Sequence, residues 1–145
     1  MPQEKNDLQE LVRTLASRFE LLAMYAFGSR ATEVAACARG EPAVVLHPAS
    51  DVDIGVLPAY GRPLNAQERV VLAAALEDAL DVSRVDLVIL PEADPFLAAN
   101  VIRGERLYAR DSDGADEYEL YVLRRAGDLA PLERERIALI LGRQP

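Results

Sequence analysis

The chain has almost none of the residues that build disulfides or zinc sites. It contains one cysteine, Cys37, one histidine, His47, and no tryptophan among its 145 residues. A single cysteine excludes an intramolecular disulfide, and a single histidine excludes a zinc site built from several His and Cys ligands. Any metal ion in this protein must therefore be held mainly by oxygen. We interpret Cys37 as a small buried hydrophobic residue and His47 as an exposed loop residue.

Long apolar runs and an excess of basic charge are also missing. No apolar stretch approaches the roughly 20 residues that cross a bilayer. The first ten residues, MPQEKNDLQE, have neither the basic start nor the apolar centre of a secretory signal. We therefore expect a cytoplasmic protein of one domain, residues 1–145. The net charge of -8, from 16 basic and 24 acidic residues, disfavours a general nucleic-acid binder.

Apolar periodicity predicts alternating helices and strands. Continuous apolar segments predict buried strands at 21–27, 51–57 and 84–90, and a shorter strand is expected at 106–110. Helices are predicted from Asp7 onward and at 30–38, 65–80 and 95–102. The residues between the helix at 30–38 and the strand at 51–57 are predicted to form a loop that includes a brief extended piece at 43–47. This order predicts an α/β (α+β) fold in which helices flank a small mixed sheet.

The C-terminal segment, 113–145, is predicted to be helical, as one or two helices around Gly127. Its apolar residues recur at helical spacing, and we expect them to pack on the sheet of the same chain. An exposed apolar stripe would instead mark an interface with another chain.

Polar residues suited to chemistry fall at the ends of the predicted strands. Gly28 and Ser29 follow the first strand, Asp51 and Asp53 open the second, and Asp86 lies within the third. Alternate side chains of a strand share a face, so Asp51 and Asp53 point the same way, and a neighbouring strand can bring Asp86 beside them. Three carboxylates on one face repel one another unless a cation lies between them.

Mg²⁺ is the cation that fits an all-oxygen site, because it binds one or two carboxylates together with substrate phosphates. Two such ions about 3.5 to 4 Å apart can activate an attacking hydroxyl and stabilise a leaving phosphate. Gly28 lets the backbone approach a phosphate, the Ser29 hydroxyl can donate to it, and Arg30 adds a positive charge. Each motif alone is more often a turn or a cap, but their combination at strand ends favours a nucleotide site.

The segments FGSRA, SDVDIGV and RVDLVIL together resemble the signature of the DNA polymerase β nucleotidyltransferase superfamily. The small size and the segment FLAANVIRGERLYARD are similar to the minimal nucleotidyltransferases, the MNT proteins of prokaryotes. The resemblance implies that Gly28 and Ser29 hold the nucleotide phosphates and that Asp51 and Asp53 bind both metal ions. It further implies that Asp86 completes one metal site and helps to activate the acceptor hydroxyl.

Many MNT proteins are antitoxins of a HEPN-domain ribonuclease toxin. The resemblance therefore implies an enzyme that transfers AMP from ATP, with two Mg²⁺ ions, to a tyrosine hydroxyl of a HEPN toxin. Two alternatives stay open: a non-catalytic antitoxin that neutralises its partner by binding alone, and a nucleotidyltransferase that acts on a small molecule such as an aminoglycoside. The segment from Arg30 to Ser50 is longer than in the minimal family pattern, so it can reshape the pocket for the base or the acceptor.

Overall fold

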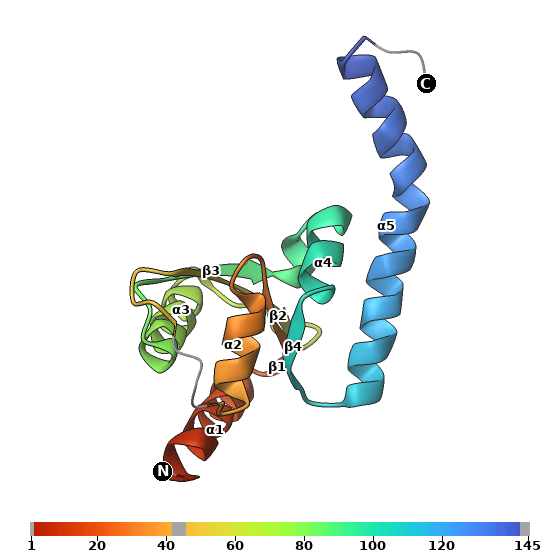
Figure 1. Ribbon diagram of the computed structural model, residues 1–145. Helices are drawn as coiled ribbons and strands as arrows, with labels where there is room; N and C mark the ends of the chain where they lie inside the picture. Colours follow the sequence, from red (N-terminus) through yellow and green to blue (C-terminus); the bar gives the residue numbers. More distant parts are fainter. Residues whose placement is uncertain (1, 42–45, 143–145) are drawn as a thin grey trace.

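The computed structural model describes residues 2–41 and 46–142, in which helices and strands alternate along the chain (Figure 1). The strands are β1 (Leu21–Phe27), β2 (Asp51–Pro58), β3 (Arg84–Ile89) and β4 (Glu105–Ala109). The helices are α1 (Pro2–Arg18), α2 (Ala31–Ala38), α3 (Ala66–Leu80), α4 (Pro95–Ile102) and α5 (Ser112–Ile140), with a short 3-10 helix, η1 (Leu90–Glu92).

The strands form one four-stranded sheet in the order β3-β2-β1-β4. Strand β1 runs antiparallel to both β2 and β4, whereas β2 and β3 are parallel. The connection between the parallel strands passes through α3, as parallel pairing requires a crossover. The predicted fold class, a small mixed sheet flanked by helices, is therefore confirmed.

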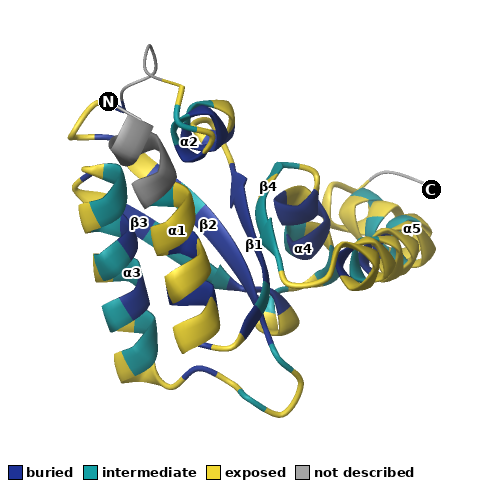
Figure 2. Ribbon diagram, turned by 90° about the horizontal axis from the view of Figure 1, so that it is seen from below, coloured by how far each residue is buried: buried dark blue, intermediate teal, exposed yellow. Residues whose placement is uncertain are grey.

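Different helices bury the two faces of the sheet. Helices α1, α2 and α3 pack on one face, and α4 and α5 pack on the other (Figure 2). Successive side chains of a strand alternate between faces, so Met24 and Ala26 pack with α1 and α3 while Tyr25 and Phe27 pack with α4 and α5. The apolar strands predicted from the sequence are thus buried on both faces.

The element boundaries differ from the predictions at several ends. Helix α1 begins at Pro2, so the predicted start at Asp7 is wrong; proline is well suited to a first helical turn. Helix α5 is continuous through Gly127, because a glycine weakens a helix without ending it. Strand β4 lies one residue earlier than predicted, at 105–109. The predicted extended piece at 43–47 falls mostly on residues 42–45, which lie outside the described residues.

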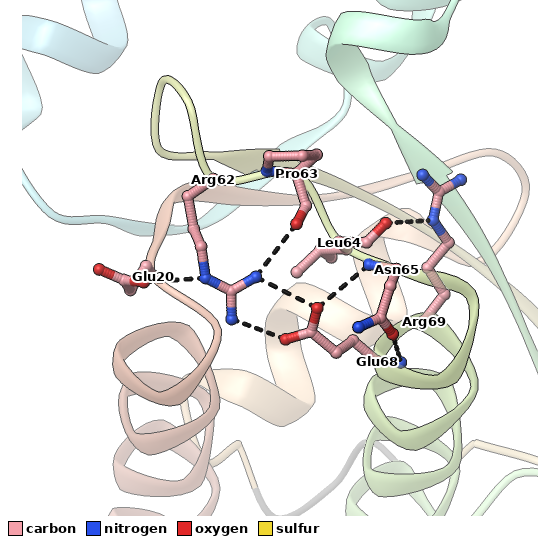
Figure 3. Close-up of polar contacts among 7 residues, drawn as sticks. All are labelled: Glu20, Arg62, Pro63, Leu64, Asn65, Glu68 and Arg69. Atoms are coloured by element: carbon pink, nitrogen blue, oxygen red, sulfur yellow. Dashed lines mark hydrogen bonds and ion pairs between the residues drawn. The ribbon is translucent and has the colours of Figure 1, made fainter.

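A cluster around Arg62 fixes the loop between β2 and α3 (Figure 3). Its guanidinium donates to Glu68 Oε2 at 2.6 Å and to Glu20 Oε2 at 2.9 Å. Asn65 and Glu68 form the predicted capping box, with Glu68 N donating to Asn65 Oδ1 at 2.8 Å and Asn65 N donating to Glu68 Oε1 at 3.1 Å. Hydrogen bonding to Arg62 lowers the pKa of Glu68. This cluster lies near Pro58, at the end of β2 opposite to its aspartates.

A second polar cluster joins the sheet to α5. Tyr25 is fully buried, and its hydroxyl donates to Glu119 Oε2 at 2.9 Å. Arg106 on β4 donates to the same carboxylate at 2.7 Å and to Asp116 Oδ1 at 2.8 Å. Burial, and next the hydrogen bond to Glu119, raise the pKa of Tyr25 far above that of a free tyrosine. The first half of α5 is therefore attached to the sheet by charge-assisted hydrogen bonds as well as by apolar packing.

Over residues 2–41 and 46–142, no helix has both the length and the apolar character needed to pass through a membrane. The long helix α5 carries charged residues along its whole length. The cytoplasmic location stays a prediction from the sequence.

Candidate active site

The three aspartates predicted from the sequence lie on two adjacent parallel strands. Asp53 on β2 is the register partner of Asp86 on β3, and Asp51 precedes Asp53 by two residues. All three therefore stand on one face of the sheet, the face that α4 and α5 cover farther along the strands. Asp51 is exposed, whereas Asp53 and Asp86 are half-buried. The fold thus brings these carboxylates together; their role as metal ligands stays a prediction.

The pKa of Asp53 reflects the proximity of the other two aspartates. Burial raises the pKa of Asp53, and the negative charges of Asp86 and Asp51 raise it further. A carboxyl group that loses hydration and faces two like charges is easier to protonate, unless a cation neutralises the group. The charge pattern around Asp53 is that of a site which favours a bound cation.

The turn that follows β1 lies directly against Asp53. Phe27 is the register partner of Asp53, and Gly28 comes next in the left-handed region with φ +77°. A Cβ atom on Gly28 would clash with Asp53 Oδ2. The absence of a side chain at Gly28 therefore lets the Asp53 carboxylate lie directly against the turn.

Ser29 and Arg30 lead from this turn into α2. Both are exposed. Arg30 is the N-cap residue of α2, and its side chain makes no capping hydrogen bond to the helix backbone. The Arg30 guanidinium donates to Glu33 Oε1 at 3.1 Å, an exposed ion pair that contributes little to stability. Backbone N–H groups at a helix start attract anions, so the position suits a phosphate. The predicted roles of Ser29 and Arg30 in phosphate binding are consistent with this placement and stay predictions.

The donor set fits Mg²⁺, because it consists of carboxylate oxygens beside a turn whose nearest residue, Gly28, has no side chain. In the part of the chain that the structure describes, however, no three His, Cys, Asp or Glu side chains stand in a ready metal-binding arrangement. Asp51 and Asp86 are close enough to raise the pKa of Asp53, but the three side chains do not converge on one point. A further charged residue, which the sequence analysis did not single out, lies beside them.

That residue is Arg84, at the start of β3. Its Nε donates to Asp86 Oδ1 at 2.9 Å, and its register partner on β2 is Asp51. Arg84 stands two residues before Asp86, just as Asp51 stands two residues before Asp53. This equal spacing is the sequence signal that could have placed Arg84 on the face of the carboxylates.

A cavity of about 620 Å³ lies elsewhere, near the opposite end of β2. Its walls are mostly apolar and include Leu22, Leu57, Pro58, Tyr60 and Tyr118. None of the three predicted aspartates lines it, so its size does not make it the site of phosphate chemistry. The carboxylate cluster itself is an open surface at the start of β2 and β3.

Replacing Gly28 with alanine is expected to destabilise the protein by about 2 kcal/mol, from left-handed strain and displacement of Asp53. Gly61 is a matched control, because its φ is +75° and an added Cβ would meet nothing within 4 Å. Chemical denaturation of both variants checks the difference. Equal destabilisation in Gly28→Ala and Gly61→Ala would contradict a contact between position 28 and Asp53.

Comparison with known proteins agrees with this geometry. The family model described as "Polymerase beta, Nucleotidyltransferase" matches residues 9–113, which include the turn after β1 and all three aspartates. The chain belongs to the polymerase β nucleotidyltransferase family. No curated protein sequence matches it significantly.

Solved structures similar to this chain include several toxin–antitoxin complexes. A toxin–antitoxin crystal structure with AMP-PNP contains a chain 29% identical to this one, with a TM-score of 0.62, covering 91% of this chain and 94% of that chain. A structure of a tri-AMPylated Shewanella oneidensis HEPN toxin in complex with MNT antitoxin matches at 28% identity and a TM-score of 0.59. That match covers 97% of this chain and 96% of the other, so the resemblance to MNT antitoxin–HEPN toxin structures spans nearly the whole fold.

Proposed function

We propose that this protein is a Mg²⁺-dependent adenylyltransferase that transfers AMP from ATP to a tyrosine hydroxyl of a HEPN ribonuclease toxin and so acts as its antitoxin. The observation that carries the proposal is the placement of Asp51, Asp53 and Asp86 on one face of two parallel strands, with Gly28 against Asp53. The similar complexes with AMP-PNP and with an AMPylated toxin support the choice of nucleotide and acceptor.

In this proposal, each site residue has a separate role in binding the metal ions or the nucleotide. Asp51 and Asp53 hold the metal ions, and Asp86 completes one metal site. The backbone at Gly28, which lies against Asp53, and the Ser29 hydroxyl hold the nucleotide phosphates in the turn that leads into α2. Bound Mg²⁺ supplies Lewis-acid stabilisation of the phosphate charge.

The transfer itself is a substitution at the α-phosphorus of ATP. The tyrosine oxygen forms a bond to the α-phosphorus, the bond to the bridging oxygen of the β-phosphate breaks, and pyrophosphate leaves. The proton of the tyrosine hydroxyl passes to a carboxylate, the role that we propose for Asp86, and then to solvent. A general base at hydrogen-bond distance from the acceptor is the usual requirement for this step.

The surface of α5 supports a protein acceptor. Its apolar residues recur at steps of three and four, and in the first half Tyr118, Val122 and Ala126 belong to the same apolar cluster as α4. The same stripe continues into the second half, where Ile137 is 45% exposed and Ile140 is 68% exposed. Figure 1 shows this half of α5 extending past α4 and the rest of the chain. The prediction that these residues pack on the sheet is therefore wrong for the end of α5, and an exposed stripe is typical of an interface.

The test is incubation of the purified protein with its HEPN partner, Mg²⁺ and ATP labelled at the α-phosphate. We expect label on the toxin, and mass spectrometry should find AMP on a tyrosine. ATP labelled at the γ-phosphate serves as the control, because that phosphate leaves with pyrophosphate. A stable complex in which the toxin stays unlabelled would exclude the transfer and leave the binding-only antitoxin.

A further inference from the structure

Four side chains form a two-by-two array at the start of β2 and β3. Asp51 is paired in register with Arg84, and Asp53 is paired in register with Asp86. Because the strands are parallel and the residues within each strand are two apart, all four stand on the same face. The array thus contains three acidic groups and one basic group.

The basic group is engaged with the carboxylate that completes the proposed metal site. Arg84 Nε lies 2.9 Å from Asp86 Oδ1, and the pKa of Arg84 is raised by this hydrogen bond and by the charges of Asp86 and Asp51. The Arg84 side chain is 67% exposed and that of Asp86 is 43% exposed. An ion pair of this exposure is weak and exchanges readily with solvent ions.

The ion pair occupies one of the two carboxylate oxygens of Asp86. Asp86 Oδ1, which accepts from Arg84 Nε, is an atom that a metal ion at the proposed site would use. A divalent cation that binds between the strands must compete with the guanidinium for that oxygen and must also enter against its positive charge.

We propose that Arg84 is a built-in counter-ion, which holds Asp86 while the site is free of metal and is displaced when a divalent cation binds. The inference rests on the proposed function, since it concerns the same carboxylates. Arg84 is a positioning residue in this scheme, because it acts through Asp86. The Arg84 guanidinium weakens the binding of a metal ion in the absence of nucleotide. It also stabilises the metal-free site by offsetting the repulsion among the three aspartates.

The test measures Mn²⁺ binding without nucleotide, by electron paramagnetic resonance of the free ion, so that it does not depend on activity. We expect Arg84→Gln to bind Mn²⁺ about three- to tenfold more tightly than the unmodified protein, because the competing charge is gone. Arg84→Lys should stay close to the unmodified protein, since it keeps the charge. Arg136→Gln is the matched control, because it removes an exposed arginine that pairs with Glu133 on α5. Unchanged or weaker Mn²⁺ binding by Arg84→Gln would overturn the inference.

Thermal unfolding provides a second readout of the same variants. Without metal, Arg84→Gln should melt at a lower temperature than Arg84→Lys, and saturating Mn²⁺ should remove the difference. A difference that persists at saturating Mn²⁺ would assign Arg84 a purely structural role and overturn the inference. Tighter Mn²⁺ binding by Arg84→Gln without toxin labelling by the unmodified protein would support the counter-ion and reject the proposed function. If none of the variants binds Mn²⁺, both are wrong.

Discussion

Replacing Asp51 and Asp53 together with asparagine is expected to abolish AMP transfer, with a loss on the order of 10³-fold. The double variant keeps the shape of both side chains but removes two negative charges from the proposed metal site. Metal-ion stabilisation of a phosphoryl transition state is worth several kcal/mol, and each ~1.4 kcal/mol corresponds to about tenfold in rate. The rate of label transfer from α-labelled ATP to the toxin is the measurement.

The same variant separates the two antitoxin hypotheses. If AMP transfer is required, Asp51→Asn with Asp53→Asn should fail to protect cells from the toxin even though the complex still forms. If contact suffices, protection should be unchanged. Residual transfer within tenfold of the unmodified protein would show that these carboxylates do not hold the metal ions.

Replacing Asp53 with asparagine should raise the stability of the metal-free protein, although it is expected to lower activity. Burial and the neighbouring aspartates raise the pKa of Asp53 in the folded state, so its protonated form is favoured by folding. The stability that this group contributes is fully present below its unfolded pKa and is lost as pH rises through its folded pKa. Near neutral pH, Asp53→Asn should therefore raise the melting temperature of the metal-free protein.

An exposed aspartate provides the control for that effect. Asp78 on α3 is exposed, so Asp78→Asn changes the net charge equally without relieving the cluster. Below about pH 3, where carboxyl groups are largely protonated, the advantage of Asp53→Asn should disappear. An equal gain from Asp78→Asn would attribute the stabilisation to net charge instead.

The second large effect is expected at the far end of α5. Replacing Ile137 and Ile140 with glutamate should raise the Kd for the HEPN toxin by about 100-fold. Burial of an isoleucine side chain contributes at least ~1.5 kcal/mol, so the loss of two accounts for a factor of this size. Isothermal titration calorimetry with purified toxin is the measurement.

Leu120 supplies the matched control for this surface. It is 50% exposed, and its helical position places it on the side of α5 opposite to the stripe that contains Ile140. Leu120→Glu should leave toxin affinity within a few-fold of the unmodified protein. A comparable loss from Leu120→Glu would show that α5 does not bind the toxin through the proposed face.

The strands and the aspartates could be predicted from the sequence because their signals are local. A continuous apolar run marks a strand buried on both faces, and an Asp-x-Asp spacing fixes two side chains on one face whatever the rest of the fold does. Asp86 could be placed beside Asp53 only on the assumption of a neighbouring strand, and the parallel register then put the two directly opposite each other.

The features that were missed depend on partners distant in sequence or on weak signals. The role of Arg84 requires the pairing of β3 with β2, which no local pattern specifies. The exposed end of α5 could not be predicted, since an apolar stripe looks the same whether it packs on its own chain or on another. The start of α1 was misplaced because Asp7 and Glu10 have the spacing of a capping box although the helix is already formed from Pro2.

The length of α5 has a consequence for the choice of substrate. At 29 residues it is about 43 Å long, and its last buried residue, Ala126, is followed by about 20 Å of helix that reaches Ile140. A partner that contacts this end and presents a tyrosine to Asp86 must reach both the end of α5 and the sheet. Under the proposed function, a short tyrosine peptide cannot make both contacts at once, so we expect it to be a poor substrate even if its side chain fits the site.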